Sequence, residues 1–165
     1  MIVARTKSVA ETRQLGGAVA ELSRPGDLVL LSGELGAGKT AFTQGFSGAL
    51  GVEGPITSPT FTLVHRYEGR LELNHLDVYR LDQLAEVTDL GLAELLDAGG
   101  VTVIEWGDVI APALPADYLE INLAYGDDDD ERIITLNFVG GRTAARLRAL
   151  TTAVQQWIDA EATPC

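Results

Sequence analysis

The chain has 165 residues, enough to bury a hydrophobic core without disulfides, and we expect it to fold as one domain. It carries 24 acidic against 12 basic residues, a formal net charge of −12, so its overall field repels nucleic acids and anionic lipids. The composition therefore argues against a protein that binds RNA or DNA directly.

The only cysteine is the last residue, Cys165, so the chain can form no internal disulfide and suits a reducing compartment. The segment from Met1 to Lys7 lacks the apolar core of a signal peptide. No run approaches the roughly 18 apolar residues of a membrane span. We therefore expect a soluble, cytoplasmic protein that makes no contact with membranes.

The N-terminal region predicts a strand followed by a helix. Residues 2–6 alternate weakly between apolar and polar, and Ser8 is a suitable cap for a helix that runs to about Leu22. Thr12 lies near the start of this helix and could face a nucleotide, although composition alone favours an exposed helical threonine. The positions that we expect to be buried are Val9, Leu15, Ala18, Val19 and Leu22.

Residues 33–40, Gly-Glu-Leu-Gly-Ala-Gly-Lys-Thr, match the phosphate-loop pattern G-x-x-x-x-G-K-[ST]. An apolar run at 27–32 predicts a buried parallel strand before the loop, and helical spacing predicts a helix over 39–50 after it. In such a loop, backbone N–H groups and the helix N-terminus bind phosphate oxygens. Lys39 would reach the β- and γ-phosphates of a nucleoside triphosphate, and Thr40 would place its hydroxyl on Mg²⁺. The alternative, an ordinary glycine-rich turn, does not require these residues at this spacing.

The next segment, residues 51–62, combines glycines, prolines and hydroxyl side chains and predicts a loop. In phosphate-loop enzymes such a loop can approach the γ-phosphate and move when that phosphate is lost. Thr57, Ser58 and Thr60 are candidates for this switch. A proline turn that leads into a strand explains the same residues, and both interpretations stay open.

A β-hairpin is predicted where two alternating segments, 61–67 and 71–76, flank a short turn. The hairpin delivers His75, Asp77 and Arg80 to the end of its second strand, where functional groups are common, although a solvated strand end is equally consistent. After it, residues 83–96 predict two short helices divided at Gly91.

A second acidic motif follows. The apolar segment 101–104 predicts a fully buried parallel strand that ends in Glu105, where a carboxylate can coordinate Mg²⁺ or orient the attacking water. Asp77 competes for this role. We prefer Glu105 for the metal, because residues 71–76 alternate and predict a half-buried strand. Trp106 would then lie beside the site, unless it is an aromatic residue of the core or its rim.

Two strands, at about 118–125 and 132–138, enclose an acidic turn at 127–130 that we interpret as solvated rather than as a metal site. A final helix is predicted over 142–158. Its arginines, Arg142, Arg146 and Arg148, could meet phosphate or an acidic partner, and a charged outer face is the simpler interpretation.

Together these elements predict an α/β protein with the phosphate-loop NTPase fold. We expect a mostly parallel central sheet with a β-hairpin insertion and flanking helices. The core would span about residues 1–140, and a helical tail would follow at about 141–160.

The order of the motifs resembles the bacterial TsaE family, also called YjeE, over roughly residues 8–140. The phosphate loop alone would not single out this family, whereas the combination of segments does. The segments that carry the resemblance are Thr12-Arg13-Gln14-Leu15-Gly16, Gly33 to Thr40, Ser58-Pro59-Thr60-Phe61, His75-Leu76-Asp77-Val78-Tyr79-Arg80-Leu81 and Ile104-Glu105-Trp106.

The resemblance implies a Mg²⁺-dependent ATPase required for the threonylcarbamoyladenosine modification of tRNA. In that family the protein is not the transferase. It docks on the partner pair TsaD and TsaB, and its ATP hydrolysis would reset that complex between turnovers. The net charge of −12 agrees with this, since the partners would carry the tRNA.

The resemblance also implies residue roles. Thr40 and Glu105 would bind Mg²⁺, while Lys39, Asp77, Glu105 and the switch hydroxyl of Thr60 would serve catalysis. Thr12 and Trp106 would lie beside the nucleotide. The remaining cofactor-binding residues are Glu34, Leu35, Gly36, Ala37, Gly38, Lys39, Thr40 and Ala41.

Two other functions fit a phosphate loop. A small-molecule kinase would pass the γ-phosphoryl to a metabolite and would need an acceptor pocket and an arginine-bearing lid, for which arginines in a terminal helix are a poor match. A GTP-dependent switch would need an Asn-Lys-x-Asp segment, which the sequence lacks, so adenine is favoured.

Overall fold

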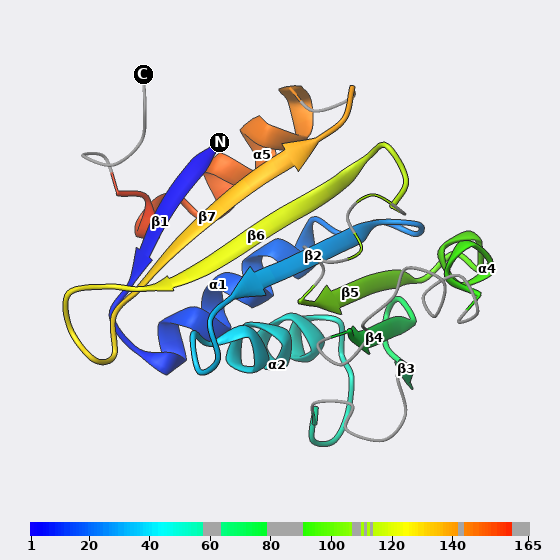
Figure 1. The fold of residues 1–165 in the computed structure, drawn as a ribbon, viewed down its shortest axis with the longest axis horizontal. Helices are drawn as coiled ribbons and strands as arrows, with labels where there is room; N and C mark the ends of the chain where they lie inside the picture. Colours follow the sequence, from blue (N-terminus) through cyan, green and yellow to red (C-terminus); the bar gives the residue numbers. More distant parts are fainter. Residues whose placement is uncertain are drawn as a thin grey trace.

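A computed structural model describes residues 1–57, 64–78, 91–106, 110, 112, 114–141 and 144–159. Its described strands form one seven-stranded sheet in the order β1-β7-β6-β2-β5-β4-β3 (Figure 1). The strands are β1 Ile2–Thr6, β2 Leu28–Gly33, β3 Val64–Tyr67, β4 Leu73–Asp77, β5 Val101–Glu105, β6 Tyr118–Tyr125 and β7 Arg132–Val139.

The centre of the sheet is parallel, because β2 pairs in parallel with both β5 and β6, and β4 pairs in parallel with β5. Both edges are antiparallel: the hairpin β3–β4 forms one, and β6, β7 and β1 form the other. The predicted phosphate-loop fold, with its hairpin, is therefore confirmed. Functional groups that follow parallel strands gather at the edge where the strands' carboxyl ends lie.

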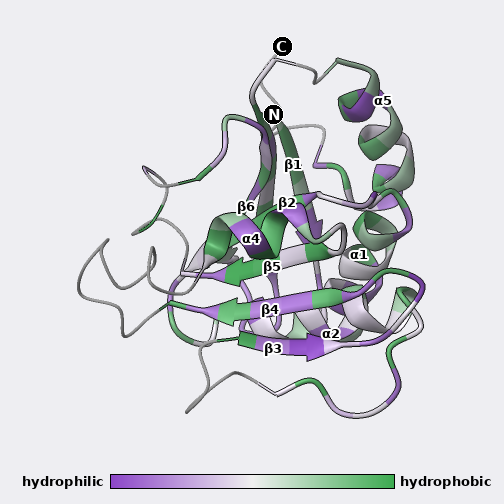
Figure 2. Cartoon of the chain, turned by 90° about the vertical axis from the view of Figure 1, so that its right-hand side faces the viewer, coloured by the Kyte–Doolittle hydropathy of each residue, from purple (hydrophilic) through white to green (hydrophobic). Residues whose placement is uncertain are grey.

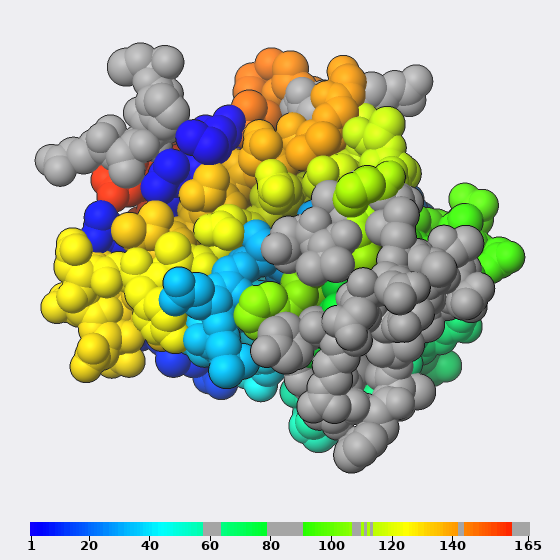
Figure 3. All heavy atoms as spheres, viewed as in Figure 1, coloured from blue at the N-terminus to red at the C-terminus, as the bar shows by residue number. Residues whose placement is uncertain are grey.

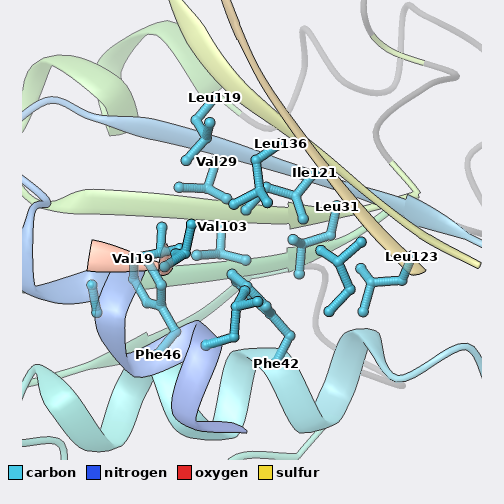
Figure 4. Close-up of a cluster of buried hydrophobic side chains, with 14 of the residues drawn as sticks. Val19, Val29, Leu31, Phe42, Phe46, Val103, Leu119, Ile121, Leu123 and Leu136 are labelled. Atoms are coloured by element: carbon cyan, nitrogen blue, oxygen red, sulfur yellow. The ribbon is translucent and has the colours of Figure 1, made fainter. Parts of the chain in front are cut away.

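The described helices are α1 Val9–Glu21, α2 Lys39–Ala49, α4 Leu92–Asp97 and α5 Ala144–Ala153, followed by a 3₁₀ turn, η3 Gln155–Trp157. α1 and α2 lie together, apart from α4 (Figure 2). The two main apolar clusters use alternate residues of β2: Val29 and Leu31 pack with the aromatic rings of α2, while Leu28 and Leu30 pack with α4. Figure 4 shows Phe42 and Phe46 directed from α2 at the sheet. None of the helices in the described ranges is long and apolar enough to cross a bilayer.

The close approach of α1 and α2 depends on glycine. A Cβ added at Gly16 would collide with the carbonyl of Phe42, and one added at Gly45 would collide with that of Arg13. α1 begins at a Ser8 cap, whose side chain accepts a hydrogen bond from the Glu11 N–H, as predicted. This packing holds the start of α1 against the phosphate-loop helix.

Several local predictions were wrong. Val9, expected to be buried, is 46% exposed, and Thr12 does not take the exposed position that composition alone favoured. β4 is buried from Leu73 to Leu76 because both of its faces are covered: Leu73 belongs to the core cluster on the side of α2, and Leu76 to the cluster on the side of α4. The alternation that we used to rank Glu105 above Asp77 therefore does not describe this strand.

The C-terminal helix is shorter than predicted. α5 ends at Ala153, and Ile158 forms an isolated antiparallel bridge with Ala4 of β1. Arg146 is half-buried and bonds both carboxylate oxygens of Asp27, so it does not lie on a purely solvated face. Ser58, Thr60, Arg80, Arg142 and the predicted helix before Gly91 lie outside the described residues.

Candidate nucleotide-binding site

A pocket of about 380 Å³ opens at the carboxyl edge of the central strands. It brings together most of the residues that the sequence predicted, namely Thr12, Leu35, Gly36, Gly38, Lys39, Thr40, Ala41, Asp77, Glu105 and Trp106. Glu34 belongs to the loop without lining the pocket, and Ala37 is buried beneath the loop. The pocket also includes Val9, Asp130 and Arg132, which the sequence did not suggest.

The loop between β2 and α2 owes its shape to glycine at two inner positions. Gly36 and Gly38 have φ angles of 80° and 105°, in the left-handed region that other residues avoid. A Cβ at Gly36 would also lie 2.7 Å from the hydroxyl of Tyr125. Gly38 caps α2, so the free N–H groups of the helix's first turn lie next to the pocket.

Lys39 is nearly buried, with an exposed fraction of 5%. Its Nζ donates to the carbonyl oxygens of Gly33 at 2.7 Å and Glu34 at 2.9 Å. The same nitrogen lies 3.8 Å from the centroid of the Trp106 ring, an arrangement typical of a cation–π contact. The ammonium group is thus held within the loop, on a wall of the pocket.

Trp106 has a φ angle of 62°, and it is the one non-glycine residue in the described ranges with a positive φ. A side chain in this region costs roughly 1–3 kcal/mol, which the surrounding structure must offset. The backbone N–H of Trp106 donates to the carbonyl of Leu31 at 2.8 Å, which fixes the turn after β5. The strained turn directs the indole at Lys39, so Trp106 lines the pocket while it also packs against the α4 side of the core.

Two carboxylates, Asp77 and Glu105, meet at the end of neighbouring parallel strands and are paired in the strand register. Both line the pocket. Glu105 is only 2% exposed and its Oε1 lies 3.0 Å from Nε2 of His75, whereas Asp77 is half-buried. The geometry therefore makes both carboxylates candidates and gives them different surroundings.

The oxygen donors at this pocket suit Mg²⁺. The hydroxyl of Thr40 and the carboxylate of Glu105 are hard ligands of the type that this ion prefers. Within the described residues no group of three or more histidine, cysteine or acidic side chains could form a complete metal cage. That donor set fits an ion bound mainly through phosphates and water, as Mg²⁺ usually is in nucleotide sites.

Thr12 reaches the pocket from the start of α1. Its hydroxyl lies 2.8 Å from the hydroxyl of Thr6 and 3.3 Å from the carbonyl of Ser8, and its methyl group faces Gly38. The hydroxyl is thus already paired within the protein, and the part of Thr12 nearest the loop is apolar.

Tyr125 and Arg132, at the adjoining ends of β6 and β7, support the phosphate loop and were not predicted. The Tyr125 hydroxyl donates to the carbonyl of Leu35 at 2.8 Å, and Nε of Arg132 donates to that of Ala37 at 3.1 Å. The Arg132 guanidinium also lies 4.6 Å from the Tyr125 ring. Figure 3 shows the loop and the β6–β7 turn side by side on the surface.

The β6–β7 turn is held by Arg5 of β1. Arg5 lies 3.1 Å from Glu131 and 3.5 Å from Asp127. The hydrogen bond from Arg5, with a second from the Asp127 N–H, lowers the pKa of the Glu131 carboxyl, and the same contact raises the pKa of Arg5. Asp127 is exposed, as expected for a solvated turn, whereas Asp130 lines the pocket.

The strand β2, the glycine-rich loop and the helix α2, set at the carboxyl edge of parallel strands beside two carboxylates, define a phosphate-loop NTPase fold. A crystal structure of Bacillus subtilis YdiB is similar, with a TM-score of 0.73 and 36% identity over 94% of this chain and 97% of that one.

Sequence comparisons identify the family. A family model described as threonylcarbamoyl adenosine biosynthesis protein TsaE matches residues 6–134. The tRNA threonylcarbamoyladenosine biosynthesis protein TsaE of Bacillus subtilis is 43% identical over 84% of this chain and 86% of its own length. The proteins of the same name from Treponema pallidum and Streptomyces coelicolor are 43% and 44% identical, over 78% and 80% of this chain and 95% and 93% of their own lengths. The chain belongs to the TsaE family.

Proposed function

We propose that this protein is the ATP-binding and ATP-hydrolysing subunit in the biosynthesis of N6-threonylcarbamoyladenosine in tRNA. One observation carries the proposal: Lys39, Thr40, Asp77 and Glu105 converge on a single pocket whose floor is a phosphate loop. Family membership supplies the pathway, since the relatives are named for this modification.

Different residues of the pocket bind the phosphates, the Mg²⁺ and the nucleoside of ATP. The N–H groups of residues 36–41 and the ammonium group of Lys39 bind the phosphates, and Trp106 covers the lysine. Thr40 and Glu105 hold Mg²⁺, which when bound neutralises the charge that develops on the phosphates. Thr12 borders the nucleoside side of the pocket through its methyl group.

Asp77 would orient the attacking water or accept its proton, because it lines the same pocket at the end of the neighbouring strand and is more exposed than Glu105. Thr60 remains our proposal for a switch hydroxyl that senses the γ-phosphate.

We further propose that the protein acts on a TsaD–TsaB complex in the cytoplasm and reaches tRNA only through these partners. The net charge of −12 supports this division, since an acidic ATPase is repelled by tRNA whereas its partners need not be. Positioning groups supplied by a partner would raise a low intrinsic rate of hydrolysis.

The direct test is phosphate release from ATP by the purified protein, alone and with purified TsaD and TsaB, with Thr40→Ala as the blank. We expect release to rise when both partners are present and to be absent in the blank. Phosphate release at the same rate with and without the partners would contradict the proposal, and so would tight ATP binding with no hydrolysis under any condition. Either result would favour a kinase with an unidentified acceptor.

A further inference from the structure

His75 does not line the pocket, but it is buried beside Glu105, which does. It is fully buried on β4, and its Nε2 lies 3.0 Å from Oε1 of Glu105 on the neighbouring strand. The hydroxyl of Thr43 on α2 lies 3.5 Å from the same oxygen and donates to the carbonyl of Lys39 at 3.0 Å. The single hydroxyl proton of Thr43 goes to the closer Lys39 carbonyl, so of these two neighbours His75 is the one left to bond Oε1 of Glu105.

The second ring nitrogen of His75 shows where the proton lies. Nδ1 is buried and has no hydrogen-bond partner among the residues that the structure describes. A proton on Nδ1, with or without one on Nε2, would leave a buried N–H unpaired, which costs more than an unused acceptor. The arrangement without an unpaired donor is the ring with its proton on Nε2 alone, which donates to Oε1 of Glu105.

We propose that His75 is a positioning residue for Glu105: the Nε2–H group holds Oε1 on the buried side and so presents the other oxygen, Oε2, to the pocket. This inference rests on the proposed function, in which Glu105 is a ligand of Mg²⁺. A carboxylate ligand that is itself hydrogen-bonded keeps one orientation, and loss of such a supporting partner typically weakens metal binding by about 10- to 100-fold.

The test compares binding of the β,γ-imido analogue of ATP by calorimetry, once with Mg²⁺ and once with a chelator. The ratio of the two Kd values measures how much Mg²⁺ contributes to binding. We expect His75→Leu to reduce this ratio by about tenfold with little change in the chelator Kd, because only the metal ligand loses its support. His75→Gln, whose amide N–H can take the place of Nε2–H, should retain most of the ratio.

His65→Leu is the matched control. His65 is the only other histidine of the chain and pairs with His75 in the β3–β4 register, but it bonds Tyr67 instead of Glu105. Its replacement should leave the ratio unchanged. The inference is overturned if His75→Leu keeps the wild-type ratio, if His75→Gln loses as much as His75→Leu, or if the wild type gains nothing from Mg²⁺. A wild type that binds no nucleotide at all would instead overturn the proposed function, and this inference with it.

A second measurement needs no substitution at His75. In His65→Leu, His75 is the only histidine, so ¹⁵N spectroscopy at neutral pH reports its ring alone. We expect a single tautomer with the proton on Nε2 and a bare Nδ1. A proton on Nδ1, or rapid exchange between the two tautomers, would overturn the inference.

Discussion

At the scale of single residues, the positive charge of the phosphate loop is concentrated on Lys39, whose ammonium group is held by two loop carbonyls and the ring of Trp106. The two carboxylates beside it differ in what supports them. Glu105 is tied to His75 on the buried side, while Asp77 is more open to solvent. Each of these differences leads to a separate measurement.

Lys39→Ala should weaken ATP binding by about 10- to 100-fold, because charge-assisted hydrogen bonds contribute roughly 1.5–3 kcal/mol. Calorimetry measures the Kd directly. The control is Lys7→Ala, which removes the chain's only other lysine, an exposed one, and should leave the Kd unchanged. Equal affinities of Lys39→Ala and the wild type would contradict the phosphate-loop assignment.

The near-isosteric changes Glu105→Gln and Asp77→Asn should affect hydrolysis differently. Glu105→Gln should raise the Mg²⁺ concentration needed for half-maximal activity, because a neutral amide is a poorer ligand for this ion. Asp77→Asn should lower kcat by about 100-fold at saturating Mg²⁺, the size of effect that general-base catalysis commonly provides. If the two variants exchange these effects, the two residues have exchanged roles.

At the scale of elements, the site depends on how α1 and α2 and the β6–β7 turn meet the loop. The contact between α1 and α2 admits no side chain at Gly45, whereas Gly48, one turn further along α2, faces open space. The adjoining ends of β6 and β7 contribute hydrogen bonds to two parts of the loop. The second support comes from residues about 90 positions away from the loop in sequence.

Gly45→Ala should destabilise the fold by about 1–3 kcal/mol, the usual cost of an overpacked contact, because its Cβ would meet the backbone of Arg13. Gly48→Ala on the same helix should be neutral or stabilising by up to about 1 kcal/mol, since alanine favours helix. Urea denaturation of the two variants gives both values. A Gly45→Ala protein as stable as Gly48→Ala would show that the helices can separate freely.

Tyr125→Phe removes the hydrogen bond to the Leu35 carbonyl and keeps the ring beneath Arg132. We expect ATP binding to weaken by about 3- to 10-fold, in line with the roughly 0.5–1.5 kcal/mol of one neutral hydrogen bond. Tyr118→Phe, at the opposite end of the same strand, is the matched control. Loss of affinity in both variants alike would point to a general effect on the sheet.

A part of the site could be predicted from the sequence when the residues that form it are close together in the chain. The strand, loop and helix at residues 28–49 are local patterns, and so is the apolar run that ends in Glu105; each could be predicted from its own residues. The supports from Tyr125 and Arg132 could not, because they depend on the pairing of β2 with β6, between segments about 90 positions apart. The burial of β4 was mispredicted for the same reason, since residues distant in sequence cover both faces of this strand.

At the scale of the whole molecule, the net charge is −12, and one cluster of ion pairs connects parts of the chain that are distant in sequence. Arg5 of β1 pairs with Glu131 and Asp127 beside the site and with Asp159 in the tail. The cluster therefore joins both ends of the described chain to the turn that supports the phosphate loop.

This cluster predicts a specific sensitivity to acid. The pKa of Glu131 is lowered in the folded protein, so its contribution to stability is complete above the ordinary value of 4.5 and is lost as the pH falls through the lowered value. We expect Glu131→Gln to be less stable than the wild type at neutral pH and to lose less of its stability below about pH 4.5. Thermal unfolding measured from about pH 3 to about pH 7 gives the pH dependence of stability for the wild type and for Glu131→Gln. Glu53→Gln, at an exposed position, is the control. Parallel curves for Glu131→Gln and the wild type would rule out this role.

The last described residues also cover the outer edge of the sheet. β1 ends the strand order, and beyond it Ile158 bridges Ala4 while the Asp159 N–H donates to the carbonyl of Val3 at 2.9 Å. These contacts occupy backbone groups through which the edges of two molecules could otherwise join. A chain that stopped at Ala153 would expose that edge. We expect such a chain to associate in concentrated solution while its nucleotide pocket stays intact.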